Sequence, residues 1–266
     1  MPEEQPAASV QVLEKGNIIF FYRPKKNIPH PKSPDDLERA YFMLLPDDQA
    51  HHQNRLFNVA HGVFPMIVPG KLLPEERDWA FVQDVGRDPG QVLENLEKEV
   101  PGPPPPTGGR IRPWARAAGE GRYVMVRHLD HTHLAYRLHK PTRPGEVQEE
   151  LQIKPEASYI ISVKNPYTPS LIELDKRPQF PERLGAKFDG QGWIPVDPTD
   201  YLDYPYTQVL LIGARTDVAA ELGITIDAEA ENQASREVLR ELEKDAREAA
   251  KAGVSLLEPL TEGRWE

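Results

Sequence analysis

Short apolar runs of strand length, separated by prolines and glycines, constrain the fold of this chain more than any other feature of its sequence. The run "NIIFFY" (Asn17–Tyr22) is rich in β-branched and aromatic residues and ends at Arg23-Pro24. Runs of similar style are "AYFMLL", "DWAFVQDV" and "TQVLLIGAR". Such runs, bounded by turn residues, are typical of β-strands. The sequence therefore predicts a sheet-rich protein, with "NIIFFY" buried on both faces.

Composition restricts the cellular compartment in which we expect the protein and the chemistry that it can perform. The chain of 266 residues has no cysteine, which excludes disulfides, zinc–thiolate sites and thiol catalysis and fits a reducing compartment. Its N-terminus is acidic and lacks the apolar stretch of a secretory signal. The longest apolar runs reach about five residues, against the ~20 that a membrane-spanning helix needs. We therefore expect a soluble, cytoplasmic protein with no membrane partner.

Helical periodicity is confined to a few segments. "RDPGQVLENLEKEV" predicts a short amphipathic helix that Asp88 caps, and "PGEVQEELQI" predicts another. The segment 227–252 predicts a long charged helix with a narrow apolar stripe. This C-terminal helix could lie on the sheet, the commoner outcome, or pair with a copy of itself in a homodimer. Trp265 is expected to anchor the C-terminus to the body. The stripe consists of Val238, Leu239, Leu242, Ala246, Ala249 and Ala250.

The proline-rich segment "PGPPPPTGGR" is the clearest predicted boundary in the chain, because four consecutive prolines form polyproline II. Strand exits on its two sides resemble one another ("GNIIFFYRP", "SYIISVKNP"), which indicates either an internal repeat or chance. The predicted fold is α+β, with a largely antiparallel sheet core in two similar lobes and a long C-terminal helix. The predicted division is a disordered tail at 1–9, an N-terminal lobe at 10–100, the linker at 101–110, a second lobe at 111–226, and the C-terminal helix and tail at 227–266.

Charge argues against a nucleic-acid binder, because the formal net charge is -10 and such proteins usually present a basic face. A local basic strip of arginines between Arg110 and Arg127 nevertheless makes nucleic-acid binding a third hypothesis. Basic residues at strand exits, Lys164-Asn165 and Arg23 with Lys25-Lys26, could form an anion-binding rim, or they could be solvated strand ends. The irregular segment 171–206 is expected to cover a sheet edge or to act as a lid. The strip consists of Arg110, Arg112, Arg116, Arg122 and Arg127.

Histidine is concentrated in "RHLDHTHLAYRLHKP" (Arg127–Pro141), which holds four of the eight histidines. Alternate residues of a strand share a face, so Leu134 and Tyr136 should face the core while His133 and His139 face away. Imidazole and carboxylate are ligands of divalent transition metals, so the segment is a candidate metal site, with a polar sheet face as the alternative. The candidate metal ligands are His128, Asp130, His131 and His133.

Several of these runs occur together in a known pattern. "GNIIFFYRP", "HTHLAYRL", "SYIISVKNP" and "LLIGA" together resemble a family of conserved proteins without an established activity, over about Gly16 to Ile226. The resemblance implies one folded unit and transfers no site.

The first functional prediction is a soluble intracellular binding or regulatory protein that acts through an interface with a protein partner or a small anionic ligand. The alternative is a hydrolase that acts on a small phosphorylated or other anionic substrate at the histidine-rich face. Convergent histidines with shifted pKa values would favour the enzyme. The catalytic candidates are His131, His133, His139 and Arg137.

Overall fold

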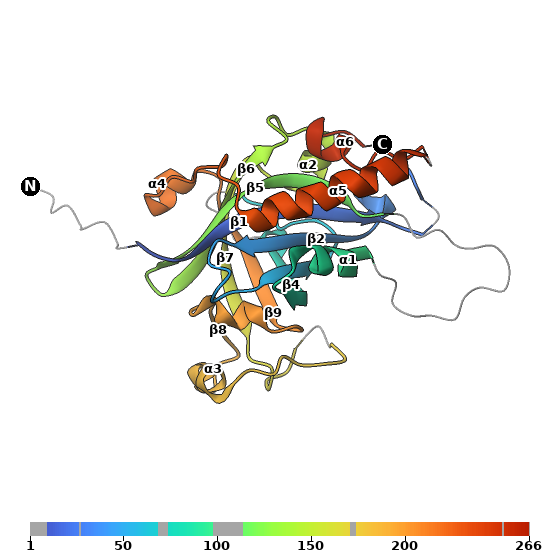
Figure 1. Cartoon of the computed structure of the whole chain (residues 1–266). Helices are drawn as coiled ribbons and strands as arrows, with labels where there is room; N and C mark the ends of the chain where they lie inside the picture. The colour runs from blue at the N-terminus through green and yellow to red at the C-terminus, as the bar shows by residue number, and fades with distance from the viewer. Residues whose placement is uncertain are drawn as a thin grey trace, which may run out of the picture.

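The chain folds into a closed, eight-stranded antiparallel β-barrel (Figure 1). The computed structural model describes residues 10–26, 28–68, 74–97, 114–170, 174–251 and 253–265, so the predicted tail at 1–9 and linker at 101–110 lie outside the described residues. Around the barrel the order is β1-β2-β3-β4-β9-β7-β6-β5, and β5 pairs again with β1. The strands are β1 (Val10–Pro24), β2 (Leu37–Pro46), β3 (Asn54–Val59), β4 (Arg77–Gly86), β5 (Arg116–His128), β6 (His131–Lys140), β7 (Glu156–Lys164), β8 (Trp193–Pro195) and β9 (Gln208–Arg215).

The predicted α+β fold, with its sheet core in two similar lobes, is wrong, because the strands form one closed barrel. Strands from the two halves of the chain pair directly, because β1 pairs with β5 and β4 pairs with β9. The pairing of β6 with β7 then closes the sheet. Closure pairs the backbone groups that an open sheet would leave free at its edges, which is its physical advantage. The short strand β8 extends the pairing of β7 beyond the point where β6 stops.

The helices lie outside the barrel (Figure 1). The long helix α5 crosses the outer wall beside α1, and its residues Val238 and Leu242 are buried against that wall. The C-terminal helix therefore lies on the sheet, and a homodimer through it stays a prediction. None of the helices among the described residues is both long and apolar enough to span a membrane. The helices are α1 (Pro89–Glu97), α2 (Glu146–Glu150), α3 (Glu182–Gly185), α4 (Val218–Leu222), α5 (Gln233–Lys251) and α6 (Glu258–Thr261), with 3-10 turns η1 (Pro34–Asp36), η2 (Pro74–Glu76), η3 (Ala186–Phe188) and η4 (Thr199–Asp203).

The strand β1 shows why "NIIFFY" is apolar throughout. Ile18 and Phe20 belong to the core inside the barrel, while Ile19 and Phe21 pack in the cluster beneath α5. The prediction that this run is buried on both faces is confirmed. Trp265 is also buried, with its ring 5.3 Å from that of Tyr22, so the C-terminus is anchored as expected.

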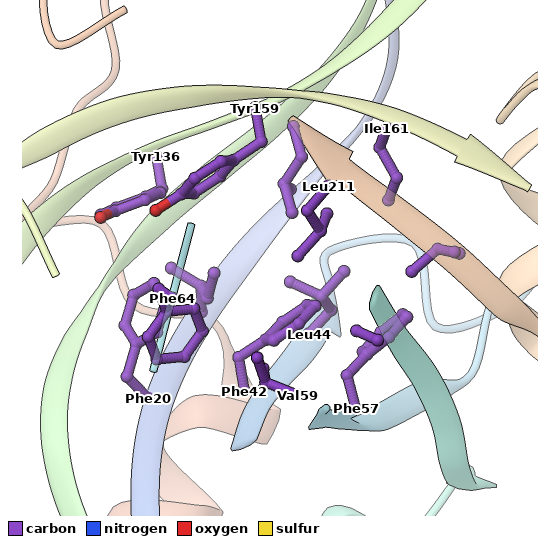
Figure 2. Close-up of a cluster of buried hydrophobic side chains, with 14 of the residues drawn as sticks. Phe20, Phe42, Leu44, Phe57, Val59, Phe64, Tyr136, Tyr159, Ile161 and Leu211 are labelled. Atoms are coloured by element: carbon purple, nitrogen blue, oxygen red, sulfur yellow. The ribbon is translucent and has the colours of Figure 1, made fainter. Parts of the chain in front are cut away.

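Aromatic and aliphatic side chains fill the barrel interior (Figure 2). Phe42 stacks on Phe57 with ring centroids 4.4 Å apart, and Phe20 meets Phe64 edge to face at 5.0 Å. Between these side chains lies a cavity of about 10 Å³, which is too small for any ligand larger than about one water. This barrel is therefore a packed core, and candidate sites must be sought on its outer wall.

Candidate metal centre

A tight hairpin between β5 and β6 brings the histidines together. His128 ends β5, Leu129 and Asp130 form the turn, and His131 begins β6 directly opposite His128. Leu129 has a positive φ of 56°, a conformation that two-residue hairpin turns require and that is costly for a bulky residue. His133 follows two positions later, on the same face of the strand as His131.

The three side chains form a compact cluster, which we call the histidine trio (His128, His131 and His133). One ring nitrogen from each lies within 4.8 Å of the other two. The ring centroids are 4.8 Å apart for His131 and His133, and 5.5 and 5.7 Å apart for the other two pairs. Three nitrogens bound tetrahedrally to zinc lie about 3.3 Å apart. A bound metal ion would therefore require the three nitrogens to move closer together than the 4.8 Å limit within which they lie.

His133 is the least exposed member of the trio. Its relative exposure is 1%, and neither of its ring nitrogens has a hydrogen-bond partner among the described residues. The same holds for Nδ1 of His128. Buried polar atoms in proteins are nearly always hydrogen-bonded, so an imidazole buried against two others without a partner needs an explanation.

The electrostatics of the trio favour neutral imidazole at His133. Burial is the main cause, and the neighbouring His131 and His128 add to it, so that the pKa of His133 falls to about 4. At neutral pH this ring carries no proton that a metal ion would have to displace, because metals bind the deprotonated nitrogen.

Asp130 has a different place from the one predicted. Its Oδ1 lies 3.0 Å from Nδ1 of His131, and it is not a member of the trio. The His131 imidazole holds the pKa of Asp130 below its usual value. A carboxylate on Nδ1 orients the ring and leaves Nε2 as the ligand atom, an arrangement common around metal-bound histidines.

Contacts on the opposite face of the hairpin hold it in place. Thr132 donates from Oγ1 to the carbonyl oxygen of Val196 at 3.2 Å. Arg127 donates from Nη1 to Oδ2 of Asp197 at 2.7 Å. The trio is therefore supported from behind by a separate segment, which limits its freedom.

Two of the predicted catalytic residues lie away from the trio on β6. His139 is six residues beyond His133, or about 20 Å along an extended strand, and Arg137 is about 13 Å away. Arg137 also forms an ion pair, with its Nε 3.7 Å from Oε2 of Glu156. The structure thus brings together His131 and His133 and leaves Arg137 and His139 elsewhere.

The described arginines of the basic strip are engaged within the chain. Arg116 is buried and donates to the carbonyl oxygen of Pro29 at 2.6 Å. Arg122 pairs with Asp47 at 2.6 Å, and Arg127 with Asp197 as above. Arg110 and Arg112 lie outside the described residues.

Sequence reasoning missed a second polar cluster, which closes one end of the barrel interior. Arg55 donates from Nη1 to Oε1 of Glu14 at 2.6 Å and from Nε to Oδ1 of Asp203 at 2.8 Å. Tyr123 also donates to Oε1 of Glu14 at 2.6 Å, and His52 Nδ1 lies 3.4 Å from Asp203 Oδ2. The one available signal was an arginine at the start of the apolar run "RLFNV".

In class, the protein is thus a packed antiparallel barrel that carries a histidine trio on its outer wall. No protein-family model, curated protein or solved structure matches the chain. The resemblance drawn from the sequence runs stays a prediction.

Proposed function

We propose that this protein binds a divalent transition metal ion, of the zinc class, through the histidine trio. The observation that carries the proposal is His133, an imidazole buried beside two others with no hydrogen-bond partner for either nitrogen among the described residues. A metal ion at the centre of the trio would be the partner of whichever of these two nitrogens carries the lone pair. Imidazole nitrogen suits zinc, copper, nickel and iron, and the chain has no cysteine to add a thiolate.

The proposal differs from the first functional prediction, a binding protein for a protein partner or a small anionic ligand, because its ligand is a metal cation. No member of the trio lines the described cavities of about 430, 600 and 660 Å³, although the last is lined in part by residues of β5. A protein partner for the barrel stays a prediction.

The second candidate function is hydrolysis. A trio of three protein ligands favours it, because that number is typical of catalytic zinc sites. Structural zinc sites are closed by four protein ligands, whereas catalytic sites keep three and leave one position for water. The trio contributes three histidines, and two of them are only half-buried. A zinc-bound water there would ionise near neutral pH and could attack a small ester.

Metal binding is tested by calorimetric titration of the metal-free protein with zinc, repeated with cobalt so that absorption spectra report the coordination. His133→Gln should abolish stoichiometric binding, because it removes the central ligand. His139→Gln is the matched control, since it changes a histidine of the same strand outside the trio.

The proposal fails if the unaltered protein takes up no zinc, or if folded His133→Gln binds it as tightly as the control does. Thermal melts of each variant show whether it is folded. His131→Gln, at the half-buried edge, gives a second variant that should lose binding with less risk to the fold. Zinc-dependent cleavage of 4-nitrophenyl phosphate that His131→Gln removes would favour the hydrolase.

A further inference from the structure

A second candidate site lies where β7 ends. A cavity of about 430 Å³ opens beside the residues that follow this strand. Its size is within the range of small-molecule sites. The described residues lining it come from the β7 exit, from the segment before α3, and from the start of β9. Those that carry the argument are Lys164, Thr168, Lys176, Arg177 and Tyr206.

The described lining is positively charged. Lys164, Lys176 and Arg177 all line the cavity, and no described lining residue is Asp or Glu. Across the part of the chain that the structure describes, none of the three forms an ion pair with a carboxylate. Three cations around one cavity repel one another unless an anion lies among them.

Lys164 is the most buried of these cations, with a relative exposure of 5%. Its Nζ donates to the carbonyl oxygens of Asn165 and Thr168, each at 3.0 Å, and to Oγ1 of Thr168. It also lies 5.8 Å from the centre of the Trp193 ring. These partners are all neutral, so they fix the ammonium group without cancelling its charge. Burial lowers the pKa of Lys164 accordingly.

Tyr206 is held at the cavity in an unusual backbone conformation. Its φ is 70°, which is rare for a bulky residue and persists only where the surroundings enforce it. Its amide donates to the carbonyl oxygen of Val82 at 2.7 Å. The ring lies under Lys176, with Nζ 5.6 Å from the ring centre. The strained residue thus positions an aromatic face beside the cations.

We propose that this cavity binds a small organic anion whose phosphate or carboxylate group lies against Lys176 and Arg177 and whose body packs on Tyr206. The planar fork of Arg177 suits bidentate binding of either group. This site is separate from the histidine trio. His133 pairs in register with Ile160, and Lys164 is four residues further along β7, or about 13 Å away.

The test is a calorimetric titration of the metal-free, full-length protein with phenyl phosphate, which combines an oxyanion with an aromatic body. We expect saturable binding that the double variant Lys176→Gln/Arg177→Gln weakens by about tenfold or more, because it removes two charge-assisted contacts. Both residues are exposed, so the variant should fold. Lys187→Gln, an exposed lysine outside the cavity, should bind as the unaltered protein does.

Inorganic phosphate and benzoate separate the two kinds of anion. Stronger binding of phosphate identifies a phosphorylated ligand, and stronger binding of benzoate identifies a carboxylate. The proposal is overturned if none of the three probes binds saturably, or if the double variant binds as tightly as Lys187→Gln. The same titration on His133→Gln should be unchanged, so failure of the metal site and failure of this site remain distinguishable.

Discussion

The two polar clusters of this barrel differ in the partners that surround their buried groups. At one end of the interior, Arg55 is fully buried and contacts the carboxylates of Glu14 and Asp203. Burial works to raise the pKa of Glu14, but Arg55, Tyr123 and His52 together outweigh it and hold that pKa below its usual value. On the outer wall, His133 is equally buried, and the polar rings beside it are the imidazoles of His128 and His131.

The difference is that the buried groups of the interior cluster have oppositely charged partners, whereas His133 has none among the described residues. In the interior cluster each charge faces an opposite charge from the same chain, although Oε2 of Glu14 and Nη2 of Arg55 have no hydrogen-bond partner among the described residues. In the histidine trio no described carboxylate reaches His133, and neither of its ring nitrogens has a hydrogen-bond partner. Four predictions test this contrast, from the largest expected effect to the smallest.

Arg55→Met should lower the free energy of unfolding by ~3–5 kcal/mol, because it leaves the buried carboxylate of Glu14 and the partly buried one of Asp203 without their cation. Urea denaturation at neutral pH measures the loss. Arg183→Met is the control, since it breaks an exposed pair with Asp200 and should change stability little. Equal effects of the two substitutions would contradict a structural role for the interior cluster.

Acid should destabilise the metal-free protein partly through His133. Its pKa is about 4 in the folded chain against 6.5 for an unperturbed histidine, so the unfolded state binds more protons between these values. The corresponding stability is present above pH 6.5, is lost as the pH falls towards 4, and amounts to about 3 kcal/mol. Urea denaturation across this range should give a shallower pH dependence for His133→Gln. Parallel curves for the two proteins would show that His133 titrates normally.

Zinc should stabilise the protein through the trio. At a hundredfold excess over the dissociation constant, binding to the folded state alone adds about 2.7 kcal/mol to the free energy of unfolding. Thermal melts with and without zinc should show this shift for the unaltered protein and for His139→Gln. An equal shift in His133→Gln would place the metal somewhere else.

Asp130→Asn should weaken zinc binding by about tenfold while leaving the metal-free stability unchanged. The reason is that Asp130 is exposed and acts by orienting His131 rather than by binding metal. Competition with a chromophoric chelator measures the affinity. Complete loss of binding would instead make Asp130 a direct ligand.

The local elements were largely predictable from the sequence. The apolar runs lie in β1, β2, β4 and β9, and the periodic segments lie in α1, α2 and α5. Period-two alternation also placed Leu134 and Tyr136 in the core, where they are found. These predictions succeed because strand and helix periodicity depends only on residues that are close together in the sequence.

Barrel closure was not predictable, because pairing partners lie far apart in the chain. Trp79 pairs with Leu210, and Val10 pairs with His128. Alternation of apolar and polar residues shows that a segment is a strand in a sheet. It does not show which other strand pairs with it. The sequence expectation of two lobes followed the proline-rich segment, whereas the strands on its two sides pair with each other.

The candidate metal site, like the fold, was predictable from the sequence only in part. The sequence alone gathered the four candidate ligands in one segment and placed His133 on the strand face that points away from the core. The structure added that His131 already belongs to β6 and that a two-residue turn sets His128 opposite it. Only the tertiary structure decided that His133 is buried, since β5 and β7 flank it with Val126 and Ile160 in register. Burial without a partner, which makes the trio a candidate site, depends on three strands and is therefore a property of the folded barrel.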